Sequence, residues 1–162
     1  MSAVFGLFRK NVDTPRMERL RALSLFVNLT PGELKIVDGL MHERQFLKDE
    51  VIFDKGDEGQ AIYIIIDGSV AIWPQGKPVD GQCIELGPGT FFGDLALLDN
   101  SVRSAQARAA ANTTLAVFFR TDFMGLLETH GLIASKISLQ LARHIGKRLR
   151  ETNNMANAHQ HL

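Results

Sequence analysis

Apolar and polar residues follow two different periods along this chain, and the change of period divides it into three parts. From residue 14 to 42, apolar side chains recur every three to four residues, which is the spacing of one helix face. From residue 43 to 120 the apolar runs are short, and glycine, proline or aspartate interrupts them every few residues. That pattern is typical of β-strands joined by turns. The helical spacing returns over residues 121–155, so the pattern predicts a β domain flanked by helices.

The first part contains two clear helix starts. Thr14-Pro15 and Thr30-Pro31 each place a capping hydroxyl before a proline, a residue favoured at the first helical position. Glu33 stands where it completes a capping box with Thr30. Residues 1–13 are predicted to be disordered, and the polar residues 156–162 are predicted to form a tail.

The middle part contains several short strands at the spacing of a sandwich or jelly roll. The predicted strands are 51–53, 61–66, 69–73, 82–86, 103–109 and 113–119. Asp67-Gly68 is a two-residue hairpin signal, so the strands on either side of it are expected to pair.

The last helix carries five apolar residues spaced four apart, namely Ile133, Ile137, Leu141, Ile145 and Leu149. Because a turn holds about 3.6 residues, such a row drifts by about 40° per step. Two interpretations stay open. The helix is a single amphipathic element on its own core, or its later apolar residues face a ligand or a partner helix.

Charge and composition exclude several classes of protein. Acidic and basic residues balance at 18 each, which argues against non-specific nucleic-acid binding. Cys83 is the one cysteine, so no internal disulfide forms, and a reducing, cytoplasmic compartment is expected. No apolar run reaches membrane-spanning length, and the start does not read as a secretory signal.

No catalytic or metal-binding constellation is visible either, so the chain is predicted not to be an enzyme and to bind no metal. The five histidines are scattered without carboxylate or cysteine at ligand spacing, and no serine sits in a nucleophile elbow. A basic run in the last helix, made of Arg143, Lys147, Arg148 and Arg150, is interpreted as a solvated face.

The stretch 91–105 contains the residues that are suited to binding a ligand. Gly93 allows close approach of a bound group, and the helical turn after it offers backbone N–H groups to an anion. Arg103 supplies a planar fork of donors that fits a phosphate. Asp94 fits beside a phosphate if it accepts a hydrogen bond from a neighbouring hydroxyl, which points to a sugar phosphate. The alternative is an Asp94–Arg103 ion pair under a loop without any ligand.

This stretch resembles the phosphate-binding cassette of cyclic-nucleotide-binding domains. The family pattern reads Gly-Glu-Leu-Ala-Leu-Leu-x-x-x-Pro-Arg-Ser/Thr/Ala-Ala, and residues 93–105 keep its spacing with Asp94 for the glutamate and Val102 for the proline. The stretch 62–71 and the helical entry near Leu25 are also similar to sensor domains of the catabolite-activator type. The resemblance implies a mainly β fold, a jelly roll or cupin-like barrel, with N-terminal helices and a long C-terminal helix. It implies one domain over residues 14–155, comprising helices at 14–42, the jelly roll at 43–120 and helices at 121–155.

The resemblance also implies a set of ligand-binding residues. Arg103 would pair with a cyclic phosphate, Gly93 and Leu95 would donate backbone N–H groups, and Asp94 would accept the ribose hydroxyl. The other residues implied to line the site are Ala96 and Ser104 in the cassette, Cys83 and Ile84 beside the purine base of the nucleotide, and Thr152 and Asn153 on the last helix.

The function implied is a stand-alone sensor that binds cAMP, or cGMP, and signals to an unidentified protein through movement of the last helix. A weak homodimer through that helix is expected. Neither a nucleic-acid partner nor a membrane-spanning segment is expected. Because only a few polar residues follow residue 155, the sequence is not expected to be a complete DNA-binding regulator of this type. The alternative is a non-catalytic interaction module that has lost or changed its ligand, as the substitutions at Asp94 and Val102 would favour.

Overall fold

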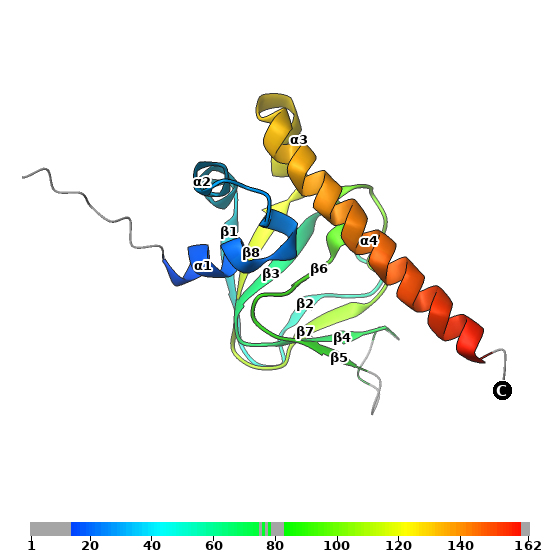
Figure 1. Cartoon of the computed structure of the whole chain (residues 1–162). Coiled ribbons are helices and arrows are strands. Elements are labelled where there is room, and N and C mark those ends of the chain that lie inside the picture. The colour runs from blue at the N-terminus through cyan, green and yellow to red at the C-terminus, as the bar shows by residue number, and fades with distance from the viewer. Residues whose placement is uncertain (1–13, 75, 77, 79–82, 160–162) are drawn as a thin grey trace, which may run out of the picture.

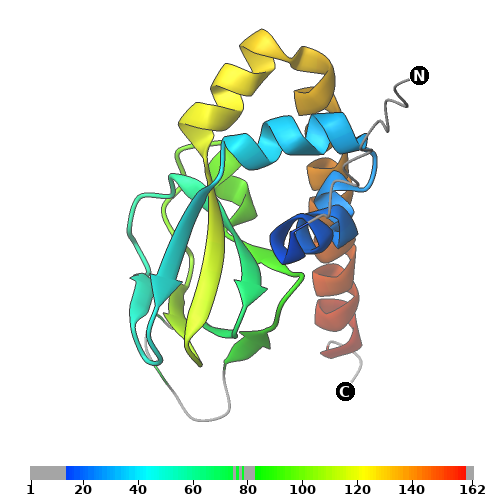
Figure 2. The same cartoon turned by 90° about the vertical axis from the view of Figure 1, so that its left-hand side faces the viewer.

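Two four-stranded antiparallel sheets pack face to face, and the helices cover one side of them (Figure 1, Figure 2). The computed structural model describes residues 14–74, 76, 78 and 83–159, so the predicted disorder of residues 1–13 lies outside it. The strands are β1 (His42–Phe46), β2 (Val51–Phe53), β3 (Ala61–Asp67), β4 (Val70–Trp73), β5 (Ile84–Leu86), β6 (Phe91–Phe92), β7 (Gln106–Ala109) and β8 (Thr113–Phe119). The helices are α1 (Pro15–Ala22), α2 (Pro31–Gly39), α3 (Arg120–Thr129) and α4 (Gly131–His159), with 3-10 turns η1 (Ser24–Phe26) and η2 (Asp94–Leu97).

The strand order is β1-β8-β3-β6 in the first sheet and β2-β7-β4-β5 in the second. The predicted β jelly roll with N-terminal helices and a long C-terminal helix is confirmed in this arrangement. The capping residues are confirmed as well. Thr14 accepts a hydrogen bond from a backbone N–H of α1, and Thr30 and Glu33 form the reciprocal capping box of α2.

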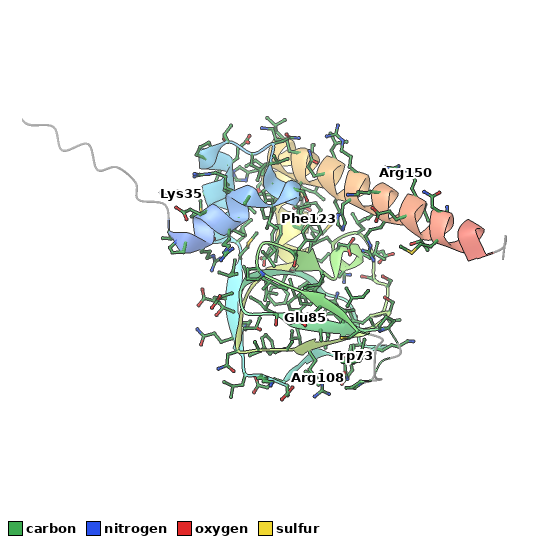
Figure 3. The ribbon with its side chains drawn as sticks, turned by 60° about the horizontal axis from the view of Figure 1, so that its bottom comes forward. Lys35, Trp73, Glu85, Arg108, Phe123 and Arg150 are labelled. Atoms are coloured by element: carbon green, nitrogen blue, oxygen red, sulfur yellow. The ribbon has the colours of Figure 1, made fainter. Side chains whose placement is uncertain are left out.

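Strand β3 lies at the centre of the molecule and is covered on both faces. Ile62 and Ile64 belong to the core that the helices form against the first sheet, whereas Ala61 and Ile65 belong to the core between the sheets. Phe123 of α3 reaches into the core on the helical side (Figure 3). A strand with apolar cover on both sides needs apolar residues at successive positions, which explains why this segment has almost no polar residue.

The predicted hairpin at Asp67-Gly68 is wrong. β3 pairs with β8 and β6 in the first sheet, while β4 pairs with β7 and β5 in the second. The turn therefore carries the chain from one sheet to the other. Gly68 has a φ of +84°, and a Cβ there would lie 2.3 Å from the carbonyl oxygen of Asn112. The glycine is required by this tight crossing rather than by a hairpin.

Helix α4 leaves the core progressively along its length. Ile133, Ile137 and Leu141 are buried, Ile145 packs at the edge of the core, and Leu149 is 60% exposed. The drift expected from the four-residue spacing is thus present, and the later part of α4 faces away from the core. The helix begins at Gly131 and continues to His159, past the predicted end at residue 155.

Candidate functional site

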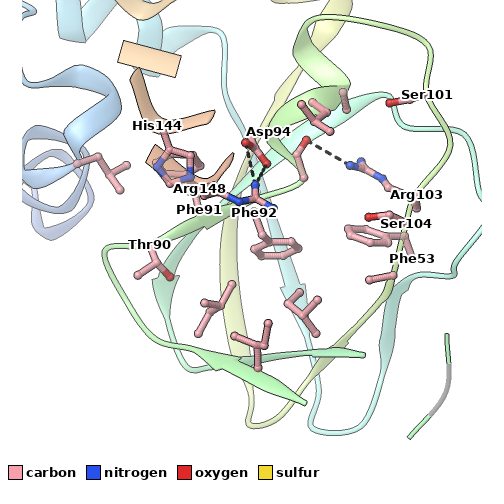
Figure 4. Close-up of a pocket in the computed structure, with 18 of the residues that line it drawn as sticks. Phe53, Thr90, Phe91, Phe92, Asp94, Ser101, Arg103, Ser104, His144 and Arg148 are labelled. Carbon is pink, nitrogen blue, oxygen red and sulfur yellow. Dashed lines mark hydrogen bonds and ion pairs between the residues drawn. The ribbon is translucent and has the colours of Figure 1, made fainter. Parts of the chain in front are cut away.

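A cavity of about 640 Å³ lies between η2 with the segment that follows it, strands β4 and β5, and the middle of α4 (Figure 4). Its apolar wall includes Ile72, Ile84 and Leu86 from the second sheet. Its polar residues include Asp94, Arg103, Ser104 and two residues of α4. Six of the predicted site residues are brought together around it within the cassette, namely Gly93, Asp94, Leu95, Ala96, Arg103 and Ser104.

Gly93 opens the turn that shapes one end of the cavity. Its backbone is left-handed, with φ +74° and ψ +26°, which an L-residue adopts only with strain. A Cβ at this position would lie 2.5 Å from Nη1 of Arg103. The glycine is therefore needed twice, for the backbone conformation and for the space that the arginine occupies.

Arg103 is a buried cation at the inner wall of the cavity, with only 7% of its surface exposed. Its Nη2 donates to the carbonyl oxygen of Ala61 at 2.8 Å, and its Nη1 donates to that of Gly93 at 3.3 Å. Its guanidinium lies over the ring of Phe53, 4.3 Å from the centroid. Burial lowers the pKa of this guanidinium, and Tyr63 is the largest influence in the opposite direction.

Two features of Arg103 remain unsatisfied in the described part of the chain. Its Nε is buried and has no hydrogen-bond partner. In the described part of the chain no carboxylate lies within ion-pair distance of its guanidinium, although Tyr63, Asp57 and Asp94 are near enough to act against the lowering of its pKa. A buried cation with no carboxylate in direct contact is stabilised by an anion that joins it. This geometry fits an anion-binding position.

Backbone pairing holds Arg103 in place from both directions. Its N–H donates to the carbonyl oxygen of Asp57, and its own carbonyl oxygen accepts from the N–H of Gly56, both at 2.8 Å. The segment 103–105, predicted as the start of a strand, is not part of β7, which begins at Gln106. It lines the cavity instead.

Arg120, at the start of α3, fastens the outer side of the cassette. Its Nη1 donates to the carbonyl oxygens of Gly59 at 3.1 Å, of Ala96 at 3.4 Å and of Asp99. These three carbonyls belong to segments before, within and after η2. The sequence showed no sign of this contact, because the helix start and the cassette are some twenty residues apart.

Asp94 is only 4% exposed, and its partner is Arg148 of α4. Nη1 of Arg148 donates to both carboxylate oxygens, at 2.9 and 3.1 Å (Figure 4). The alternative Asp94–Arg103 ion pair is therefore wrong for this structure. The four cations of the basic run are exposed, as the interpretation of a solvated face expected, but that interpretation did not include the contact that Arg148 makes with Asp94.

His144 also lines the cavity, and its ring lies against Phe91 with the centroids 4.6 Å apart. Sequence reasoning missed both His144 and Arg148. A signal was available for Arg148, since it stands seven residues after the buried Leu141. Seven residues make nearly two helical turns, so the two side chains share one face of α4.

The remaining predicted residues lie at or beyond the edge of the cavity. Ile84 lines it and is 58% exposed, whereas its neighbour Cys83 is exposed and is not among the lining residues. Thr152 and Asn153 are exposed on α4, four and five residues past Arg148, and do not line the cavity. Four residues correspond to about 6 Å along a helix, and their contact with a base stays a prediction.

Two further findings concern the part of the chain that the structure covers. It contains no group of three or more histidine, cysteine, aspartate or glutamate residues placed to hold a metal ion. None of its helices is long and apolar enough to cross a bilayer.

Comparison with known proteins gives one consistent result. The model of the family described as cyclic nucleotide-binding domain matches residues 43–130. The chain is similar to the cyclic AMP receptor protein of Thermus thermophilus, at 33% identity over 83% of this chain and 61% of the relative. It is also similar to a cyclic nucleotide-gated potassium channel of Mesorhizobium japonicum, at 31% identity over 70% of this chain and 30% of the channel.

Among solved structures, the catabolite activator protein of Thermus thermophilus superposes with a TM-score of 0.67 and 32% identity. The match covers 82% of this chain and 63% of that structure. The chain thus spans less than two thirds of the length of these relatives.

Proposed function

Because this chain belongs to the cyclic nucleotide-binding domain family, we propose that it is a regulatory sensor that binds cAMP, with cGMP as the second candidate. The observation that carries this proposal is Arg103, a buried cation with an unpaired Nε at the wall of a cavity. A cyclic phosphate offers the anionic oxygens that this group lacks.

The charge of the cavity supports a ligand with a single negative charge. Its lining contains two arginines, Arg103 and Arg148, and one aspartate, Asp94, which leaves one positive charge with His144 taken as neutral. The phosphodiester of a cyclic mononucleotide carries one negative charge. A cyclic dinucleotide carries two and would leave one of them without a partner.

The shape of the cavity supports the orientation of such a ligand. The phosphate would meet Arg103, with backbone N–H groups of Gly93 and Leu95 beside it and Ser104 donating its hydroxyl. The sugar hydroxyl would donate to Asp94. The base would lie against the apolar wall of Ile72, Ile84 and Leu86, which belong to strands on the opposite side of the cavity.

The output of the sensor is proposed to be the position of α4. His144 and Arg148 of this helix line the cavity, while Leu149 beyond them is exposed. Ligand binding would favour one arrangement of cassette and helix, and the exposed end would then engage an unidentified partner. One candidate partner is a second copy of the chain, paired through α4. Light scattering with and without nucleotide would show whether such a dimer forms.

The experiment that tests this function is a calorimetric titration of the protein with cAMP, cGMP, 5′-AMP and cyclic di-GMP at fixed salt. We expect saturable binding of one cAMP or cGMP per chain, and much weaker binding of the other two compounds. If none of the four binds, the chain is the interaction module without a ligand that the substitutions at Asp94 and Val102 would favour.

A further inference from the structure

Three aromatic rings lie against the guanidinium of Arg103 and against one another. The ring centroid of Phe53 lies 4.3 Å from Cζ of Arg103 (Figure 4), and that of Tyr63 lies 5.4 Å from it. The rings of Tyr63 and Phe92 stack, with their centroids 5.2 Å apart and their planes at 12°. The ring of Phe53 is tilted against both, at 5.6 and 5.9 Å. These three rings form an aromatic platform under the buried cation.

An irregularity in strand β2 brings Phe53 to this place. The register of β2 with β7 shifts between Val51 and Phe53. In a regular strand, neighbours such as Ile52 and Phe53 point to opposite faces of the sheet. Here both pack against the core between the two sheets, and Phe53 also lines the cavity. Bulges next to binding sites commonly redirect a side chain in this way.

Two carboxylates lie near the guanidinium without touching it. Asp57 and Asp94 both act against the lowering of the pKa of Arg103, yet neither is within ion-pair distance. The carboxylate of Asp94 is already bound by Arg148. Asp57 is exposed, its Oδ2 accepts from the N–H of Asp54, and a carboxylate has about four acceptor positions. Asp57 can therefore still take a cation.

Attraction between Arg103 and Asp57 should be strong, because a buried charge is poorly screened. Their backbones are already joined, since the N–H of Arg103 donates to the carbonyl oxygen of Asp57 at 2.8 Å. The ring faces offer the guanidinium a different attraction. A ring carries no net charge, so the cation stays uncompensated and its Nε stays unpartnered. A carboxylate would instead cancel the charge and occupy the planar fork of donors.

We propose that Phe53, supported by Tyr63 and Phe92, is a positioning residue that keeps the guanidinium of Arg103 away from Asp57, so that the phosphate of the ligand meets a cation with no carboxylate in contact with it. This inference rests on the function proposed above. Without the ring of Phe53, Arg103 turns to Asp57, and the ligand then binds only the fraction of molecules in which that ion pair is open.

The test compares the cAMP affinity of five proteins by calorimetry. They are wild type, Phe53→Leu, Phe46→Leu, Asp57→Asn and the double variant Phe53→Leu with Asp57→Asn. Phe46 is the matched control, because it is also a partly buried ring packed against the core between the sheets, and it does not line the cavity. A thermal melt shows that each protein is folded. Phe53→Met, which nearly conserves side-chain volume, replaces the leucine variant if that one does not fold.

A cation–π contact away from water corresponds to roughly a tenfold change in affinity. We expect Phe53→Leu to bind cAMP about tenfold more weakly than wild type, and Phe46→Leu to stay within about threefold of it. Asp57→Asn alone should change the affinity less than about twofold, because the ring already keeps the two groups apart. In the double variant the affinity should return to within about threefold of wild type. Loss of core packing alone gives no such rescue.

A second measurement needs no ligand. Protons held over a ring face give NMR signals shifted upfield, so the Nε–H signal of Arg103 reports its place on the platform, and Arg103→Lys identifies that signal. We expect the upfield shift in wild type and in Phe46→Leu, and its loss in Phe53→Leu.

Three results would overturn the inference. Equal losses of affinity in Phe53→Leu and Phe46→Leu would mean that Phe53 only fills the core. A double variant as weak as Phe53→Leu would mean that Asp57 does not compete for Arg103. An Nε–H signal that is the same in wild type and Phe53→Leu would mean that the ring does not hold the guanidinium. If wild type binds neither cAMP nor cGMP, the proposed function fails, and the NMR signal still decides whether Phe53 positions Arg103.

Discussion

Replacement of Arg103 is the most direct test of where an anion binds. The side chain is buried, and it already donates to the carbonyl oxygens of Ala61 and Gly93. Only some of its N–H groups are therefore available to form hydrogen bonds with a ligand. Its Nε has no partner to give up, and the bond from Nη1 to Gly93 is long at 3.3 Å. These two groups can turn to a phosphate at little cost.

The size of the effect follows from this count. Each hydrogen bond between charged groups contributes about 1.5–3 kcal/mol, but one of the two replaces an existing bond. We therefore expect Arg103→Ala to weaken cAMP binding by about 2–4 kcal/mol, which is roughly 30- to 1000-fold. Arg103→Lys keeps the charge and loses the planar fork, so its affinity should be intermediate.

Calorimetry with cAMP at fixed salt measures the affinities, and a thermal melt shows whether each variant is folded. Arg108→Ala is the matched control, because Arg108 lies in β7 and does not line the cavity. A folded Arg103→Ala protein that binds cAMP within threefold of wild type would refute the phosphate assignment.

Three further predictions use other parts of the structure. Gly93→Ala places a Cβ at a left-handed φ and against Nη1 of Arg103, so we expect about 1–2 kcal/mol lower unfolding free energy and at least tenfold weaker cAMP binding, by urea melts and calorimetry. An unfolding free energy and a cAMP affinity that both match wild type would show that the backbone there relaxes freely, which would contradict this prediction. The pKa of Glu33 is lowered, first by its hydrogen bond with Lys136, so the stability it contributes is present above the ordinary glutamate pKa and is lost as pH falls through the lowered value. Urea midpoints from pH 7 to pH 3 should therefore fall less steeply in Glu33→Gln, and parallel curves would contradict the assignment. The Cys83 thiol is exposed and adjoins Ile84 of the cavity wall, so it should react readily with a maleimide and more slowly at saturating cAMP, whereas equal rates would place it away from the ligand.

The cassette could be predicted from sequence because its chemistry is contiguous. Gly93, Asp94 and Arg103 stand within eleven consecutive positions, and the backbone between them is short enough to bring them to one cavity. The capping box of Thr30 and Glu33 is local in the same sense, since its two hydrogen bonds span three residues. Strand β8 was predicted to the residue, as Thr113–Phe119.

Contacts between distant elements depended on tertiary packing. Asp67-Gly68 has the local chemistry of a hairpin, yet its flanking strands join different sheets, because each finds its partners in β-strands much later in the chain. Arg148 is one of four cations in a basic run. Its seven-residue spacing from Leu141 places it on the same face of the helix, but the sequence does not say that this face meets the cassette. Burial of Ile137 and Leu141 fixes the rotation of α4, and that rotation brings Arg148 to Asp94. The sequence alone determined which residues could bind an anion, whereas only the packed core decided which helix residue completes the site.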